Sequence, residues 1–396
     1  MNKKFLRIIS YFVKKILRVT GYFVEALKYM VLYPIAMVFY RHRHIYIFAE
    51  RGTDARDNGY YLYRFYRQHY PDKETYYIIS KKSADRQKVM ELGHGVNHGS
   101  FKHYLLFIAS EYMISTHIMG YSPNVNFYSR FAERLPLKGK RIFLQHGITS
   151  NDLPGLYSKK TKLDIFICGA KPEFDYVVEK FGYQHNEVKY TGLARYDGLH
   201  ERQLKNRILC MPTWRAYLLY GYSASIEESD YVTKWNSLLN DKRLIEALNE
   251  KDLELVFYPH YDMQKYLSLF ETSSQRVIIA DRNHYDVQQL LKESQLLVTD
   301  YSSVFYDFAY MQKPVVYYQF DQEQYYKGHY KKGYFDYDTM GFGEVVKHAD
   351  HAVEVILSYI NRQFAMDNEY KKRIERFFPL YDTQNCQRIF DEIEKL

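Results

Sequence analysis

The stretch that most constrains the fold is residues 296–308, where a short apolar run is followed by a polar turn and a second apolar run. Residues 296–299 predict a buried strand, and 304–311 predict a helix that Pro314 follows closely. Ser302 and Ser303 stand where this helix begins, and a serine oxygen there commonly accepts from the free N–H groups of the first turn. The same turn carries the positive end of the helix dipole and can hold a phosphate. The two serines therefore predict either a structural helix cap or a phosphate site.

Strand-like and helix-like stretches alternate through most of the chain. The strand candidates are 44–49, 74–79, 112–115, 141–144, 163–168 and 188–191, and then 207–211, 253–257, 277–280, 296–299 and 315–318. Helical patterns separate them, among them 59–70, 171–181, 232–249 and 287–293. Such alternation predicts parallel sheets with helices on both faces. A chain of 396 residues exceeds the usual size of one core, so two domains are expected.

A polar stretch at 192–206 is the candidate linker between these domains. We predict a basic amphipathic, membrane-associating segment at 1–43, an N-terminal Rossmann-like domain at 44–200, a C-terminal Rossmann-like domain at 201–350 and a helical tail at 351–396. The predicted fold class is α/β, with two doubly wound domains that face a cleft. An amphipathic N-terminal helix precedes them in the sequence.

The first forty residues form the basic amphipathic segment. One helical face is apolar and consists of Phe5, Ile8, Ile9, Phe12, Ile16, Val19 and Phe23. The opposite face is basic and consists of Lys3, Lys4, Arg7, Lys14, Lys15 and Arg18. Such a helix suits an anionic membrane surface, and the following apolar run, 29–40, is interrupted by Pro34 and is too short to span a bilayer. We expect a peripheral anchor; packing onto the protein's own surface and a true span are the alternatives.

Composition narrows the partners. The net charge of +8 indicates an anionic partner, which leaves nucleic acid, anionic lipid and a phosphorylated substrate. Nucleic acid is disfavoured because the basic residues concentrate in the amphipathic start. Cys168, Cys210 and Cys386 form no CxxC pair, so neither a disulfide framework nor a zinc site is indicated, and a reducing, cytoplasmic compartment is expected. P-loop, dinucleotide-binding and zinc-protease motifs are missing from the sequence.

Polar clusters follow several predicted strands, where sheets of this kind bind ligands. His146 follows 141–144 and is suited to general-base chemistry, with a hydrogen-bonded structural histidine as the alternative. Arg215 has the planar fork that can clamp a diphosphate, with a surface arginine as the alternative. The other strand-end candidates are Thr213, His260, Asp300, Ser302 and Ser303.

These blocks occur in an order and spacing that resemble the CDP-glycerol glycerophosphotransferase family, which includes teichoic acid primases and poly(alditol phosphate) polymerases. The matching blocks are His146-Gly147, Thr191-Gly192-Leu193-Ala194-Arg195-Tyr196-Asp197, Pro212-Thr213-Trp214-Arg215, Pro259-His260, Thr299-Asp300-Tyr301-Ser302-Ser303 and Asp307-Phe308. The chain departs from the family pattern at Ala216, Tyr261, Lys332-Gly333 and Gly341-Phe342-Gly343.

The resemblance implies a GT-B fold with the CDP-alditol bound mainly by the second domain and the acceptor entering over the first. By position, His146 matches the family's general base, and His260, Ser302 and Ser303 match its diphosphate contacts. Thr213 and Arg215 match the Pro-Thr-Trp-Arg block. Asp300 is expected to orient its loop, and Asp307 is expected either to reach the cytidine ribose or to be a capping or solvated acid.

The predicted function is transfer of glycerol phosphate or ribitol phosphate from CDP-glycerol or CDP-ribitol to a hydroxyl of a lipid-linked glycan or polymer acceptor, with release of CMP. His146 and His260 are the predicted catalytic residues, and no metal or cofactor is expected. The resemblance places such an enzyme peripherally on the cytoplasmic face of the cell membrane. The alternatives are a GT-B glycosyltransferase that uses a nucleotide sugar and a non-catalytic membrane-surface scaffold.

Overall fold

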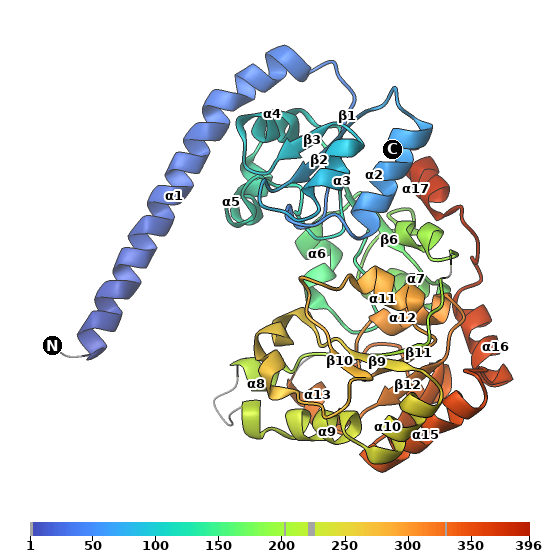
Figure 1. Cartoon of the computed structure of the whole chain (residues 1–396). Coiled ribbons are helices and arrows are strands. Elements are labelled where there is room, and N and C mark those ends of the chain that lie inside the picture. The colour runs from blue at the N-terminus through green and yellow to red at the C-terminus, as the bar shows by residue number, and fades with distance from the viewer. Residues whose placement is uncertain (1–2, 202, 221–225, 329–330) are drawn as a thin grey trace. The chain divides into compact units, whose positions relative to one another are not determined.

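The computed structural model describes residues 3–201, 203–220, 226–328 and 331–396 (Figure 1). The chain divides into two compact units, and each is described by itself. Unit 1 is Met1–His146, Lys162–Ile167 and Ile389–Leu396; unit 2 is Gly147–Thr161 and Cys168–Arg388. The boundaries predicted after residues 43, 200 and 350 stay predictions.

The first sheet has seven strands in the order β3-β2-β1-β4-β5-β6-β7, and its pairings from β3 to β6 are parallel. The strands are β1 (Ile45–Ala49), β2 (Glu74–Ile79), β3 (Gly95–Asn97), β4 (Tyr112–Ser115), β5 (Lys140–Phe143), β6 (Ile165–Cys168) and β7 (Val188–Tyr190). The helices along this part of the chain are α1 (Lys3–Tyr40), α2 (Asn58–His69), α3 (Arg86–Glu91), α4 (Phe101–Ala109), α5 (Val125–Phe131), α6 (Ser158–Thr161) and α7 (Lys171–Lys180).

The second sheet has six parallel strands in the order β10-β9-β8-β11-β12-β13. They are β8 (Arg207–Met211), β9 (Glu254–Phe257), β10 (Val277–Ile279), β11 (Leu296–Thr299), β12 (Val315–Tyr318) and β13 (Gly343–Val346). The helices are α8 (Ala216–Tyr220), α9 (Asp230–Leu239), α10 (Lys242–Glu250), α11 (Val287–Glu293), α12 (Val304–Tyr310), α13 (Gln322–Gly328), α14 (Tyr337–Met340), α15 (Ala349–Asn361), α16 (Asn368–Phe377) and α17 (Asn385–Ile393).

Two sheets of parallel strands joined by helices confirm the predicted α/β class. The prediction of a single helix at 232–249 is wrong. The chain forms two helices there, α9 and α10, which are separated at Asn240 and Asp241. The Asp241 carboxylate accepts from the backbone N–H groups of Arg243 and Leu244, which begins a new helix there. The sequence pattern also missed the short edge strands β3 and β13.

α1 is one continuous helix that passes through Pro34 (Figure 1). A proline inside a helix removes a hydrogen bond and costs about 3 kcal/mol. Burial of Tyr29, Leu32 and Ala36 in the core of unit 1, where α1 packs on α4, offsets that cost. Its stretch Leu17–Tyr40, which extends beyond the apolar run predicted at 29–40, is long and apolar enough to cross a membrane by length and composition.

The apolar face predicted for the helix start can be followed only in part, since the side chains of residues 1–14 and 16 lie outside the described ones. Val19 and Phe23 are 61% and 65% exposed, so this face is not buried in unit 1 where it is described.

Candidate functional site

Polar side chains gather where β8 and β11 end, at the point where the strand order of the second sheet reverses. β8 leads into Thr213, and β11 leads into Asp300. The backbone N–H groups of Thr213 and Tyr301 donate to Asp300 Oδ1 at 2.8 and 2.6 Å. Burial raises the pKa of Asp300, and nearby Arg215 and these two N–H groups oppose that rise. Because ligands of doubly wound sheets bind at such a reversal, this edge is the candidate ligand site of unit 2.

Arg215 is fully buried at this edge. Its Nη2 lies 2.9 Å from Asp300 Oδ2, its Nε donates to Asp321 Oδ2 at 2.7 Å, and its Nη1 donates to the Thr213 carbonyl at 2.7 Å. Burial lowers the pKa of Arg215, but the two carboxylates raise it, and the net direction is upward, so the guanidinium stays charged. Since these donors face protein acceptors, the geometry favours a role for Arg215 in holding the loop over direct contact with a diphosphate. Asp321, which follows β12, was missed from the sequence.

Ser302 and Ser303 precede α12, with Ser302 half-buried and Ser303 exposed. Ser303 is in the N-cap position, but its side chain makes no capping hydrogen bond. The structural-cap alternative is therefore not realised by the Ser303 hydroxyl. Gly147 lies beside it, since a Cβ added to Gly147 would stand 3.4 Å from Ser303 Oγ. The missing side chain leaves room for a ligand next to the hydroxyl.

His260 stands at the same edge of the second sheet. Its backbone N–H donates to the Pro212 carbonyl at 3.1 Å, which ties the end of β9 to the loop after β8. The ring stacks on Trp214 with centroids 6.2 Å apart, and its Nδ1 accepts from the Asp262 backbone N–H at 3.3 Å. The side chain remains 39% exposed, so the ring is accessible to a ligand.

Asp307 is joined to Arg195 in a buried ion pair. Nε of Arg195 donates to Asp307 Oδ2 at 2.8 Å, and Nη2 donates to Oδ1 at 2.6 Å. Each side chain is 5% exposed. The alternative of a solvated acid at Asp307 is wrong, because the carboxylate is turned inward to a buried arginine. The ribose contact and the capping role stay predictions. The sequence placed Arg195 in a block typical of the family but predicted no role for it.

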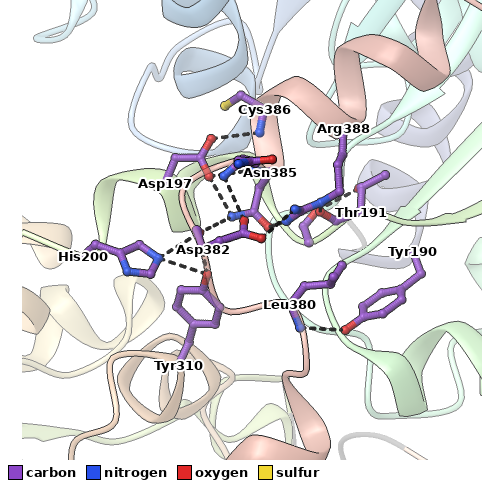
Figure 2. Close-up of polar contacts among 12 residues, drawn as sticks. Tyr190, Thr191, Asp197, His200, Tyr310, Leu380, Asp382, Asn385, Cys386 and Arg388 are labelled. Atoms are coloured by element: carbon purple, nitrogen blue, oxygen red, sulfur yellow. Dashed lines mark hydrogen bonds and ion pairs between the residues drawn. The ribbon is translucent and has the colours of Figure 1, made fainter.

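Asp197, two residues after Arg195, holds the start of α17 (Figure 2). Its Oδ1 accepts from Asn385 N–H at 2.9 Å and from Asn385 Nδ2 at 2.7 Å, and its Oδ2 accepts from Cys386 N–H at 2.8 Å. Arg388 extends the cluster by donating to the Thr191 carbonyl at 2.8 Å. The block from Thr191 to Asp197 is thus fixed on one side to Asp307 and on the other to the helical tail.

In unit 1, His146 follows β5 on a constrained backbone. Gln145 has a φ of +60°, a conformation that costs an L-residue about 1–2 kcal/mol. Three hydrogen bonds hold it there: Asn58 Nδ2 donates to the carbonyls of Leu144 and Gln145 at 3.3 and 2.8 Å, and Gln145 Nε2 donates to the Ile167 carbonyl at 2.7 Å. This arrangement leaves His146 exposed at the end of the strand.

His117 stacks on His146 with ring centroids 4.8 Å apart and planes 12° from parallel. Arg51 Nε donates to His117 Nε2 at 2.9 Å, so Nδ1 of the neutral ring carries the proton toward Thr116 Oγ1, 2.9 Å away. Burial, His146 and Arg51 together lower the pKa of His117 to about 3. The sequence singled out neither His117 nor Arg51, although each comes two residues after a predicted strand and the two strands end at one edge.

Glu50 anchors the loop that carries Arg51. Its carboxylate, 2% exposed, accepts from the backbone N–H groups of Arg56, Asp57 and Tyr60 at 3.0, 2.8 and 3.2 Å. Burial and the nearby Asp57 raise the pKa of Glu50 to about 7. Glu50 therefore positions the loop between β1 and α2, which was also missed from the sequence.

These blocks lie within a single family match. The family model for CDP-glycerol:poly(glycerophosphate) glycerophosphotransferases matches residues 31–395. The chain belongs to this family. The predicted family is therefore confirmed, and the match extends into the helical tail.

Curated relatives carry names from teichoic acid synthesis. The chain is 32% identical over 383 residues to the minor teichoic acid biosynthesis protein GgaB of Bacillus subtilis, covering 94% of this chain and 42% of that protein. It is 26% identical over 267 residues to the teichoic acid poly(glycerol phosphate) polymerase of Bacillus spizizenii, covering 61% and 64%. The chain thus spans less than two thirds of the length of each of these relatives.

Solved structures agree on the fold. The wall teichoic acid polymerase TagF H548A matches with a TM-score of 0.67 and 18% identity, covering 97% of each chain. This likeness confirms the predicted GT-B-like fold. A UDP-GlcNAc 2-epimerase from Neisseria meningitidis bound to UDP-GlcNAc also matches, with a TM-score of 0.52, 11% identity and coverage of 89% of this chain and 100% of the epimerase. Because that protein is an epimerase, the fold alone does not choose the reaction.

Proposed function

We propose that this glycerophosphotransferase-family chain transfers an alditol phosphate from CDP-glycerol or CDP-ribitol to a hydroxyl of a lipid-linked glycan or polymer acceptor, releasing CMP. The family match over residues 31–395 is the observation that carries the proposal. The exposed Ser303 hydroxyl beside Gly147 supports a phosphate site at the edge where β11 ends.

In the reaction, an acceptor oxygen attacks the β-phosphorus and forms a new P–O bond. The bond from that phosphorus to the bridging oxygen breaks, and the oxygen leaves with CMP. His146, directly before Gly147 in the chain, takes the hydroxyl proton as general base. The ring of His117 stacks on that of His146 with centroids 4.8 Å apart, which orients the proposed base.

The leaving CMP needs its growing negative charge stabilised, and preorganised donors supply this most effectively. In the proposed site, Ser302, Ser303 and His260 donate to the phosphates. Arg215, Asp300 and Thr213 hold the loop that places these groups, and Asp307 fixes Arg195 beside Gly147. No metal or cofactor takes part in this proposed mechanism.

We place the protein peripherally on the cytoplasmic face of the cell membrane, where a lipid-linked acceptor would be reached. The exposed apolar side chains of α1 and its basic residues Lys15 and Arg18 support adsorption to an anionic surface.

Nucleotide release tests the reaction. Purified protein is incubated with a membrane lipid extract and with CDP-glycerol, CDP-ribitol or common nucleotide sugars in turn. CMP release with one CDP-alditol would establish the proposed chemistry and the donor together. UDP or another nucleoside diphosphate would instead support sugar transfer, and the absence of both release and CMP binding would support a scaffold.

A further inference from the structure

A groove between α1 and α5 has no part in the proposed reaction. Its volume is about 660 Å³, within the range of about 300–1,000 Å³ that is typical of sites for small molecules. The walls are α1 residues between 19 and 33, Phe127 and Phe131 of α5, and the segment 134–137. Apart from Arg134, these side chains are apolar or aromatic, so the groove suits a hydrocarbon chain.

One end of this groove is basic. A second cavity of about 580 Å³ shares Val19, Tyr22, Phe131 and Arg134 with the first, so the two are adjacent. It adds three cations: Lys15, Arg18 and Arg130. Within the described part of the chain, no carboxylate forms an ion pair with any of the four basic residues. Their charge is therefore available to an anionic group placed at this end.

The floor of the groove is built by close aromatic packing. Tyr29 stacks on Phe127 with centroids 5.4 Å apart and planes 14° from parallel, and Tyr22 meets Phe131 edge-on at 5.5 Å. Tyr29 is 5% exposed, and its hydroxyl has no hydrogen-bond partner among the described residues. The ring of Tyr29 thus forms a rigid aromatic floor beneath the groove, and its hydroxyl lies below that floor.

The apolar rim is exposed to solvent. Phe23 and Met30 line the groove and are 65% and 67% exposed, and a contiguous exposed apolar surface marks an interaction site. We propose that the groove binds one anionic phospholipid of the membrane, with an acyl chain along α1 and α5 and the phosphate at Arg18, Arg130 and Arg134. This inference rests on the proposed membrane association and adds a defined lipid site to it.

Photo-crosslinking tests the site. Full-length protein is bound to vesicles containing phosphatidylglycerol with a diazirine in its acyl chain, irradiated and mapped by mass spectrometry. We expect labels on 127–137. The double variant Arg130→Gln, Arg134→Gln should reduce this labelling at least fivefold, because the phosphate loses two cations. Lys371→Gln, Lys372→Gln removes the same charge from exposed positions of α16 and should leave the labelling unchanged.

Ala26→Trp keeps every charge but fills the groove, and it should also lose labels on 127–137 while the protein still sediments with vesicles. Labels confined to exposed α1 positions such as Val31 and Val38 would overturn the proposal and indicate adsorption alone. Equal labelling by a phosphatidylcholine probe would also overturn the proposal. The same holds if the groove stays unlabelled because two copies of the chain associate over it. CMP release from a CDP-alditol is measured separately. Loss of the lipid site would therefore not contradict the proposed reaction, and absence of CMP release would not contradict the lipid site.

Discussion

Arg195 and Asp307 form a bidentate ion pair with Nε–Oδ2 and Nη2–Oδ1 distances of 2.8 and 2.6 Å, although 112 residues separate them in the chain. The pair joins the block that ends at Asp197 to the helix that follows Ser303. A buried pair of this kind contributes little to folding stability compared with apolar packing. Loss of one partner, however, leaves the other charge buried without a counter-ion.

Asp307→Asn is therefore expected to lower the free energy of unfolding by about 3–5 kcal/mol, because Arg195 would keep its charge without a buried counter-ion. Urea denaturation followed by circular dichroism measures the change. Asp175→Asn is the control, since Asp175 pairs with Lys171 on the surface and its loss should cost no more than about 1 kcal/mol. Equal effects of the two substitutions would contradict the buried pair.

Gly192 is expected to tolerate no side chain. Its φ is +81°, and a Cβ there would stand 1.7 Å from Asn385 Oδ1. Gly192→Ala should cost about 1–2 kcal/mol for the backbone alone, and more because Asn385 would move from Asp197. Gly155→Ala, with open space around the new Cβ, is the matched control. Thermal unfolding of both variants measures the difference, and a stable Gly192→Ala protein would argue against the contacts in Figure 2.

The sequence predicted the two parallel sheets because strand-forming runs and helical patterns alternate over short distances. It also predicted that Thr213, His260 and Asp300 follow strands, and the structure places these strands in one sheet; that ligands bind at this edge stays a prediction. These features are local, so a single window of sequence contains them.

Partners of buried charges were not predictable in the same way. Asp307 is paired with Arg195, and Arg215 is paired with Asp300 and Asp321, across long separations in the chain. A sequence shows a charged residue but not its burial, so surface contact with a substrate was the natural prediction for both. His117 was missed because its importance comes from stacking on His146, which lies far along the chain beyond β5.

Substitution of Arg215 is expected to lower stability, whereas substitution of Ser303 is expected to lower turnover. Arg215→Lys loses the planar contacts with two carboxylates in a fully buried position and should destabilise unit 2 by about 3 kcal/mol. Ser303→Ala should change stability by no more than about 0.5 kcal/mol, because the hydroxyl makes no capping bond. CMP release by Ser303→Ala should nevertheless fall by about 10²-fold. Normal turnover in this variant would exclude Ser303 from the proposed phosphate site.

His146→Ala is expected to remove the general base while leaving the nucleotide site intact. Turnover should fall by about 10²–10⁴-fold, and CMP affinity measured by calorimetry should stay at the wild-type value. His351→Ala, at an exposed position of α15, controls for loss of a histidine. Loss of CMP binding in His146→Ala would remove His146 from the proposed role.

His117 makes the stability of unit 1 depend on pH. Its pKa is lowered to about 3 by burial, His146 and Arg51, whereas an unfolded histidine titrates near 6.5. Below that value the unfolded state binds a proton that the folded state does not, so stability falls as pH falls from about 6.5 toward 3.

Chemical denaturation at pH 7.5 and at pH 5.0 tests this dependence, with His117→Gln as the comparison. A glutamine side chain cannot titrate, so wild type should lose about 1 kcal/mol more than the variant between the two pH values, a modest figure because the ring is partly exposed. His351→Gln, at an exposed position of α15, should leave the wild-type difference unchanged. If the stability of the wild type changes with pH no more than that of His117→Gln, then folding does not lower the pKa of His117.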